Sequence, residues 1–439
     1  MNDFHKRSKR WLCIWLLIIS VAFSSNTVQA QEPALADAPF LYRVEFPEEI
    51  GSVEQRWEGT SPKTIILIQD SHISLEVQLN ISKIIETLVK EYNVGLVNIE
   101  GADHEKIDFE ELRQLEPRDV VERVSIEFLK ESRINGAVYA KINCDKDFKQ
   151  YGTEDKDKYL ENYKYYLSVI EHNQQLADFI LNVRNQLMKN KQKFLSQKLI
   201  EFINVEILFR DGDTSLISYF KILIKNANEL GIDLIQYPSI TQMVEIALSE
   251  EQSEMFKSVD NEGLLNELAQ LSKAIIDQMA TTPRAQQFVE LLNKIMRLQD
   301  MLRLRVLPDD YEDYLQNESE FQEARVSSLI KALFPDMDMT PLIGLNELLK
   351  NMDFFYQKAH ERSRVIFKNS LKNMETEGTD ISVIVSGGFH TNELVNLCKE
   401  NDISYIRVMP KVTSTESTVD YEGRMLELKA ELIQDEDEE

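Results

Sequence analysis

His72 and His390 lie near opposite ends of this 439-residue chain, yet each follows a short apolar run of the kind that forms a buried strand. A third such run ends at Glu100. A neutral imidazole can bind a metal ion or move a proton near neutral pH, and a carboxylate can bind the same ion or act as a general base. If the fold brings the three residues together, they predict a metal site or an acid–base site.

The elements around His72 and Glu100 predict that they meet. Residues 63–69 and 94–100 are expected to be strands, and residues 74–92 between them carry apolar side chains at helical spacing. A strand–helix–strand unit pairs its strands in parallel, and ligands of parallel sheets bind beyond the carboxyl ends of the strands. Both residues would therefore lie at one edge of a sheet.

The end of the chain repeats this arrangement. Strands are expected at residues 381–386 and 403–408, with a helix at residues 390–401 between them, which brings His390 to the same edge. A less apolar strand is expected at residues 147–152, nearer the side of the sheet.

The residues between these two parts have an almost wholly helical pattern. We expect an α/β fold: a parallel-sheet core with βαβ units at both ends of the chain and a large all-helical insertion. The expected division is a signal peptide at 1–30, a leader packing on the core at 31–62, the first part of the core at 63–155, a helical insertion or cap at 156–375, the second part of the core at 376–411 and an acidic, disordered tail at 412–439.

Further carboxylates follow the predicted strands. Asp70 lies in the same turn as His72 and would orient it or bind the same metal ion; alternatively, it caps the following helix. Glu154 and Asp155 close the third predicted strand and are the next candidates for the site.

Gly387 and Gly388 form the sharpest local signal. Paired glycines between a strand and a helix permit unusual backbone angles and expose N–H groups at the start of the helix. They predict an oxyanion site beside His390. The alternative for His390 is a packed, hydrogen-bonded core residue.

Glu100 ends an otherwise apolar strand, where a charge is costly unless it is paired or lies in a cleft. Arg362, in a late predicted helix, would pair with Glu100 or hold a substrate carboxylate, and an exposed helix arginine is the alternative. Tyr405 and Arg407 are interpreted as ordinary strand residues.

The N-terminus has the pattern of a secretory signal peptide. Basic residues between Lys6 and Arg10 precede an apolar stretch at residues 11–23, and small residues at 28–30 offer a cleavage site before Gln31. The stretch is short for a membrane span of ~20 residues, although an uncleaved membrane anchor is the alternative. We expect a secreted or periplasmic protein without a membrane anchor after cleavage.

The net charge and the cysteines indicate which classes of partner and which cross-links to expect. A formal charge of −26 disfavours nucleic acid and anionic lipid. Cys144 and Cys398 would form a disulfide in an oxidising compartment or stay as buried free thiols. The oligomeric state is left open.

The segments that carry these residues resemble a known superfamily. The loop histidine at 72, Glu100 with its following glycine, and the Gly-Gly-Phe-His segment ending at His390 resemble the TIKI and TraB/PrgY proteins, the ChaN-like haem-binding proteins and the erythromycin esterases. Exported bacterial members look closest. The resemblance implies that His72, Glu100 and His390 are active-site residues and that Arg362 is a helix arginine found in some members. Gln69 stands where the motif has glycine, which puts the geometry of the first loop in doubt.

The resemblance implies divalent-metal-dependent peptide hydrolysis for TIKI-like members and activation of water by histidine and glutamate for the esterases. We therefore expect a hydrolase of an amide or ester bond that acts on a peptide or a small-molecule ester. His72, Glu100 and His390 would hold Mn²⁺, Zn²⁺ or Co²⁺, or act without metal. The alternatives are a haem- or metal-binding protein of the ChaN-like type without turnover, and a non-catalytic interaction protein that uses its helical face.

Overall fold

The structure is a computed structural model, and it describes residues 39–71, 74–171, 173–210, 213–248, 261–304, 306 and 308–412. The predicted signal peptide, His72 and residues 413–439 of the predicted tail lie outside these ranges. Two compact units are present. Among the described residues, unit 1 comprises residues 39–163 and 356–412, and unit 2 comprises Lys164–Phe355.

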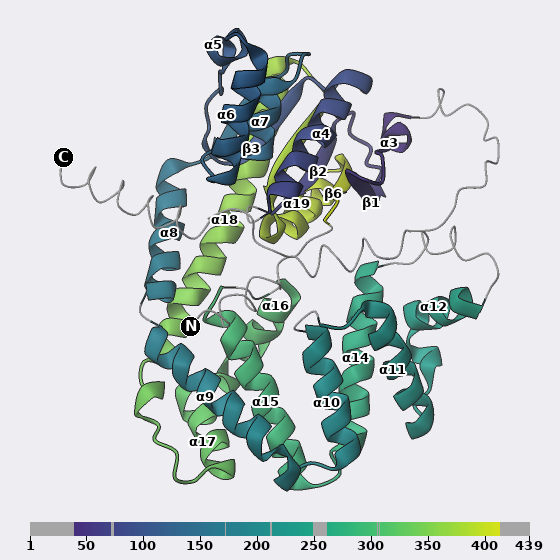
Figure 1. Cartoon of the computed structure of the whole chain (residues 1–439), viewed down its shortest axis with the longest axis vertical. Coiled ribbons are helices and arrows are strands. Elements are labelled where there is room, and N and C mark those ends of the chain that lie inside the picture. The colour runs from purple at the N-terminus through teal and green to yellow at the C-terminus, as the bar shows by residue number, and fades with distance from the viewer. Residues whose placement is uncertain are drawn as a thin grey trace. The chain divides into compact units, whose positions relative to one another are not determined.

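Unit 1 contains a six-stranded sheet (Figure 1). The strands are β1 (Gly51–Trp57), β2 (Thr64–Asp70), β3 (Leu96–Asp103), β4 (Lys149–Glu154), β5 (Ile381–Gly387) and β6 (Ser404–Pro410). Their order is β1-β6-β2-β5-β3-β4, and every neighbouring pair is parallel except β1 with β6. The predicted α/β fold with a parallel core is therefore confirmed, and β4 lies at the side of the sheet as expected.

The leader holds an element that the sequence did not predict. Part of it forms β1, which pairs antiparallel with β6 and carries an irregularity between Val53 and Gln55. This strand has no apolar run because only Gly51 within it is fully buried. An edge strand with half-exposed residues gives a weak hydrophobic pattern, so its sequence resembles a loop.

Unit 1 also contains helices. They are α3 (Phe40–Arg43), α4 (Leu75–Glu91), α5 (Glu110–Arg113), α6 (Arg118–Lys130), α7 (Gly136–Asn143), α8 (Lys156–Glu171), α18 (Leu345–Glu377) and α19 (Gly388–Glu400). Of these, α4 and α7 pack on one face of the sheet and α18 and α19 on the other. Helices α8 and α18 each contribute residues to both units. Unit 2 therefore begins later and ends earlier in the sequence than the insertion predicted at residues 156–375.

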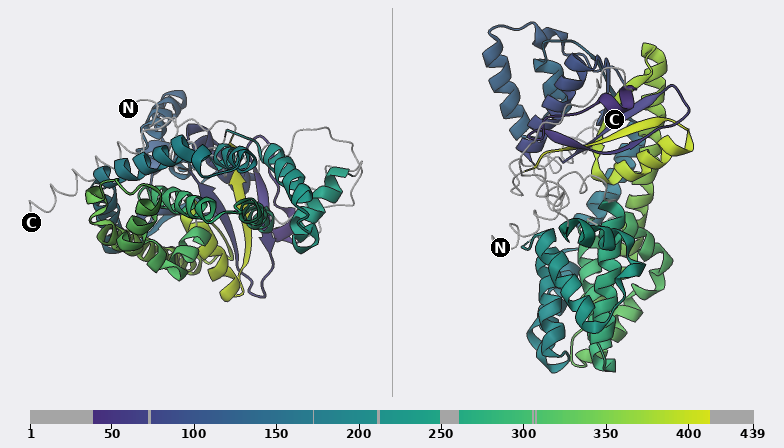
Figure 2. Two further views of the ribbon diagram at one scale, coloured as in Figure 1. Left: turned by 90° about the horizontal axis from the view of Figure 1, so that it is seen from below. Right: turned by 90° about the vertical axis from the view of Figure 1, so that its right-hand side faces the viewer.

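Strand alternation separates two cores. Ile66 and Ile68 of β2 pack with α4 and α7, whereas Leu67 packs with residues of α18 and α19 on the other face. Figures 1 and 2 show the early helices and the late helices on opposite sides of the sheet. Cys144 belongs to the α4 core and Cys398 to the α19 core, and both are free, buried thiols. The sheet separates them, which explains why they do not pair.

The connections diverge from the middle of the sheet. From β2 the chain crosses through α4 to β3, and from the neighbouring β5 it crosses through α19 to β6 on the other side. The two crossover helices lie on opposite faces. In open α/β sheets, ligands bind beyond the carboxyl ends of two such strands.

The described residues of unit 2 form helices without a strand. The α-helices that lie wholly within it are α9 (Gln174–Asn190), α10 (Gln197–Arg210), α11 (Leu216–Leu230), α12 (Pro238–Leu248), α14 (Asn261–Met279), α15 (Pro283–Met301), α16 (Pro308–Gln316) and α17 (Glu323–Leu333). Their amphipathic faces bury residues such as Phe288, Leu291 and Ile295 of α15. Across the described residues of both units, no helix is both long and apolar enough to span a membrane.

Candidate active site

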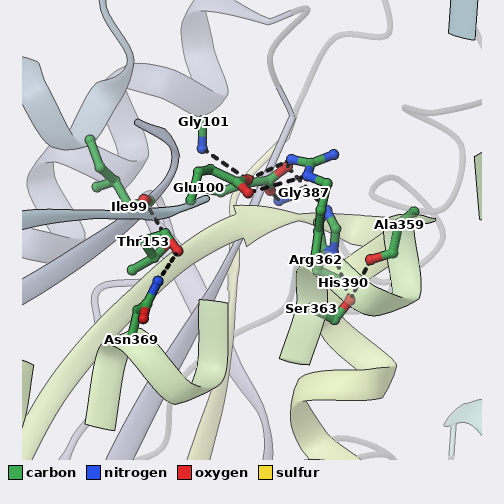
Figure 3. Close-up of polar contacts among 11 residues, drawn as sticks. Ile99, Glu100, Gly101, Thr153, Ala359, Arg362, Ser363, Asn369, Gly387 and His390 are labelled. Carbon is green, nitrogen blue, oxygen red and sulfur yellow. Dashed lines mark hydrogen bonds and ion pairs between the residues drawn. The ribbon is translucent and has the colours of Figure 1, made fainter. Parts of the chain in front are cut away.

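Four charged or titratable side chains meet at the carboxyl edge of the sheet in unit 1 (Figure 3). Glu100 lies in β3 where its apolar run ends, and Glu154 ends the neighbouring β4. Arg362 comes from α18 and His390 from the first turn of α19. The parallel sheet thus brings Glu100 and His390 together, as the sequence predicted.

Arg362 holds the two carboxylates. Its Nη2 lies 2.6 Å from Glu154 Oε1 and 3.1 Å from Glu100 Oε1, and its Nε lies 3.2 Å from Glu154 Oε2. The exposed fractions of these side chains are 9% for Arg362, 2% for Glu154 and 14% for Glu100. Burial by itself would lower the pKa of Arg362, but Glu154 and then Glu100 reverse this effect and raise it. The guanidinium is therefore a permanent cation.

His390 is held at both ring nitrogens. Its Nε2 lies 3.1 Å from Glu100 Oε1, and its Nδ1 lies 2.7 Å from the Ser363 hydroxyl. Ser363 Oγ is also 3.1 Å from the carbonyl oxygen of Ala359, one helical turn earlier. Figure 3 shows this chain running from α18 through the imidazole to the carboxylate.

This geometry suits both protonation states of His390. A neutral imidazole fits in two tautomers: either Nε2–H donates to Glu100 and Nδ1 accepts from the Ser363 hydroxyl, or Nδ1–H donates to Ser363 and Nε2 faces the Glu100 carboxyl group. When the imidazole is protonated, both nitrogens donate, and the Ser363 hydroxyl turns to donate to Ala359. A proton can therefore enter or leave the ring without leaving a buried donor or acceptor unpaired.

The two glycines have different environments. The N–H of Gly387 donates to Glu100 Oε2 at 2.6 Å, so in this arrangement the predicted oxyanion donor already has a carboxylate acceptor. Gly388 is the first residue of α19, and a Cβ there would lie 2.8 Å from Nε2 of Gln69. Glycine at 388 therefore lets the Gln69 side chain lie against the start of α19.

The remaining candidates lie elsewhere or outside the described residues. Asp70 is 5% exposed, and its Oδ1 accepts from the amide of Gln78 on α4, on the sheet face opposite Glu100. Asp155 is exposed and accepts from the N–H of Lys158, which makes it a helix cap. His72 lies outside the described residues, so its predicted role stays a prediction.

Sequence reasoning missed Ser363 and Tyr159. Tyr159 of α8 places its ring 4.9 Å from the Arg362 guanidinium, a distance typical of a cation–π contact. Ser363 follows Arg362 directly and lies four residues after Ala359, so helical spacing could have pointed to it only once Arg362 was known to face the sheet.

The carboxylates and the imidazole at this site are side chains of the kinds that bind metal ions. Among residues 39–412 that the structure describes, no group of three His, Cys, Asp or Glu side chains is arranged to hold one. The reason at this site is chemical: the Arg362 cation already lies between Glu100 and Glu154, and His390 Nε2 already faces Glu100. These donors do not fit a metal as arranged. Metal or haem binding through His72 stays a prediction.

Searches of known protein-family models, curated proteins and solved structures gave no match to this chain. The resemblance to the TIKI/TraB, ChaN-like and erythromycin-esterase superfamily therefore stays a prediction from the motifs.

Proposed function

We propose that unit 1 is a hydrolase of ester or amide bonds in which Glu100 activates water and His390 stores the proton. The observation that carries this proposal is the chain of contacts from Glu100 Oε1 to His390 Nε2 and from His390 Nδ1 to Ser363. A carboxylate bonded to an imidazole at the carboxyl edge of a sheet is a suitable general base.

The proposed reaction is a simple addition and elimination. Glu100 takes a proton from water while the water oxygen forms a bond to the substrate carbonyl carbon. With the resting imidazole proton on Nδ1, where it donates to Ser363 while Ser363 donates to Ala359, His390 Nε2 takes the water proton from Glu100 and the ring becomes charged. When the tetrahedral intermediate collapses, the bond to the leaving oxygen or nitrogen breaks, and the proton returns through Glu100 to that leaving group.

Arg362 has a positioning role in this scheme. It fixes Glu100 from one side while the Gly387 N–H fixes it from the other. Glu154 in turn fixes Arg362 through two hydrogen bonds. Preorganised groups of this kind need not reorganise during the reaction, which is a major source of catalytic rate.

The test is hydrolysis of a panel of p-nitrophenyl esters, lactones and short peptides by the full chain and by His390→Gln. Loss of the proton store should lower kcat by roughly 10²–10⁴-fold, the usual contribution of general acid–base catalysis. Arg123→Gln, which removes an exposed arginine of α6, is the matched control and should keep full activity. Equal activity of the wild type and His390→Gln would refute the proposal.

A further inference from the structure

A row of polar side chains crosses the sheet near its carboxyl edge, on the face that carries α18 and α19. Gln69 of β2 is paired in register with Ser386 of β5. Glu100 lies beyond Ser386 on β3, and Arg407 lies on β6, on the other side of β2, in register with Leu67 two residues before Gln69. The residues that precede Gln69, Ser386 and Arg407 on this face are Leu67, Ile384 and Tyr405, which belong to the α19 core. The polar row therefore begins where the core ends.

Arg407 differs from Arg362 in its surroundings. Its Nη2 is 3.4 Å from Gln69 Oε1, and its Nε is buried without a hydrogen-bond partner. No carboxylate of the described residues lies within ion-pair distance of it, whereas Arg362 contacts two. A partly buried guanidinium without a counter-ion is costly, so this position suits an anion that is supplied from outside.

Two further groups at this edge of the sheet can donate a hydrogen bond to an anion. Ser386 is 3% exposed and is paired with Gln69 in the sheet, so its hydroxyl lies on the same face as the Gln69 side chain. Helix α19 starts without a side-chain cap. The first N–H groups of a helix attract negative charge.

The position of these groups is also informative. They lie where the connections leave β2 and β5 in opposite directions, which is the usual ligand site of an open α/β sheet. Glu100 is next in the row, and its charge is balanced in part by Arg362. An anion bound here would lie beside the carboxylate proposed to activate water.

We infer that Arg407, Gln69, Ser386 and the first turn of α19 bind an anionic group of the substrate, such as a carboxylate or a phosphate. We call these residues the Arg407 cluster. That the ligand is a substrate rests on the proposed hydrolase function, but anion binding itself is measurable without turnover. An Arg guanidinium and helix N–H groups recognise both kinds of oxyanion.

Line broadening of the ³¹P signal of inorganic phosphate and of the ¹³C signal of labelled acetate, in low salt, would measure binding to the full chain. Arg407→Gln should lower the affinity for the ion by roughly tenfold, which is the effect of losing one charge-assisted hydrogen bond. Gly388→Ala should lower this affinity by a few fold because the new Cβ displaces the Gln69 side chain. Arg123→Gln removes the same charge elsewhere and should bind as the wild type does.

The outcomes separate the two proposals. Preference for phosphate or for acetate identifies the substrate group. If the wild type binds neither ion, or if Arg407→Gln binds equally well, the inference is overturned while the hydrolase proposal stands. If Glu100→Gln and the wild type bind the ion equally and no substrate is hydrolysed, the anion site stands and the hydrolase proposal fails.

Discussion

At the scale of single residues, the candidate site depends on charge balance in a buried place. Glu154 is almost fully buried, and its carboxylate is tolerated because both oxygens accept from Arg362. The sequence could not reveal this because Glu154 and Arg362 are far apart along the chain. It identified Glu100 as a charge that needs a partner and Arg362 as a candidate for that partner, and the structure places the two 3.1 Å apart.

Arg362→Met should therefore destabilise unit 1 strongly. Removing the cation leaves two carboxylates unpaired, and breaking a buried ion pair from one side costs about 3–5 kcal/mol. Arg364→Met is the control on the same helix because Arg364 is 71% exposed and its ion pair with Glu393 is open to solvent on that side; it should cost less than about 1 kcal/mol. Urea unfolding measures both values, and equal losses would contradict this account of the site.

Asp353 in unit 2 carries a carboxyl group whose surroundings favour its neutral form. Burial raises the pKa of this half-buried carboxyl from 3.8 to about 6, although the Tyr314 hydroxyl donates to it. The folded state therefore favours the neutral acid. Its contribution to stability is fully present below pH 3.8 and is lost as the pH rises through 6.

The full shift would correspond to ~3 kcal/mol, which solvent screening of a half-exposed group reduces to about 1 kcal/mol. Asp353→Asn should remove this loss, so its stability should fall less than that of the wild type between pH 4 and pH 7. Urea midpoints across this range measure the difference. Parallel curves for the two proteins would show that Asp353 does not titrate in this way.

At the scale of elements, the apolar runs predicted the parallel strands well. Strands β2, β3, β5 and β6 begin within two residues of their predicted starts because each is buried on both faces. Strand β1 and helix α7 were missed. The edge strand β1 lacks a continuous apolar run, and α7 is only eight residues long and buried nearly all round, so it shows little periodicity.

Close backbone approach also positions the site elements, and Gly152 is the clearest case. A Cβ at Gly152 of β4 would lie 1.9 Å from the carbonyl oxygen of Asp103 in β3. Gly152→Ala should therefore push β4 away from β3 and destabilise unit 1 by about 1–3 kcal/mol, the usual range for overpacking.

Gly95→Ala is the matched control because a Cβ at that position meets no atom within 4 Å. Thermal unfolding of the two variants provides the comparison. Equal melting temperatures would mean that β3 and β4 can separate without cost.

At the scale of the whole molecule, the sheet divides unit 1 into two cores, and each contains one thiol. Burial raises the pKa of Cys398 to about 12 and also raises that of Cys144. In a chain that carries Cys13→Ser, both thiols should react with Ellman's reagent only when unit 1 opens. Fast labelling of Cys398 in native buffer, compared with the rate in denaturant, would contradict the buried α19 core.

The parallel sheet also explains which parts of the site the sequence could predict. The motifs at both ends of the chain placed Glu100 and His390 correctly at one sheet edge because parallel strands share their carboxyl ends. Ser363 and Arg407 depend on the rotation of α18 and on strand alternation in β6, and neither could be fixed from one sequence.

The most direct test of the central claim is the hydrolysis rate of Glu100→Gln beside the wild type, on the best ester or amide substrate from the panel and at equal folded fraction. Glutamine keeps the shape of the side chain but cannot take a proton from water. The account predicts a fall in kcat/KM of roughly 10²–10⁴-fold. A rate within about threefold of the wild type, a difference of less than ~1 kcal/mol in barrier, would contradict it.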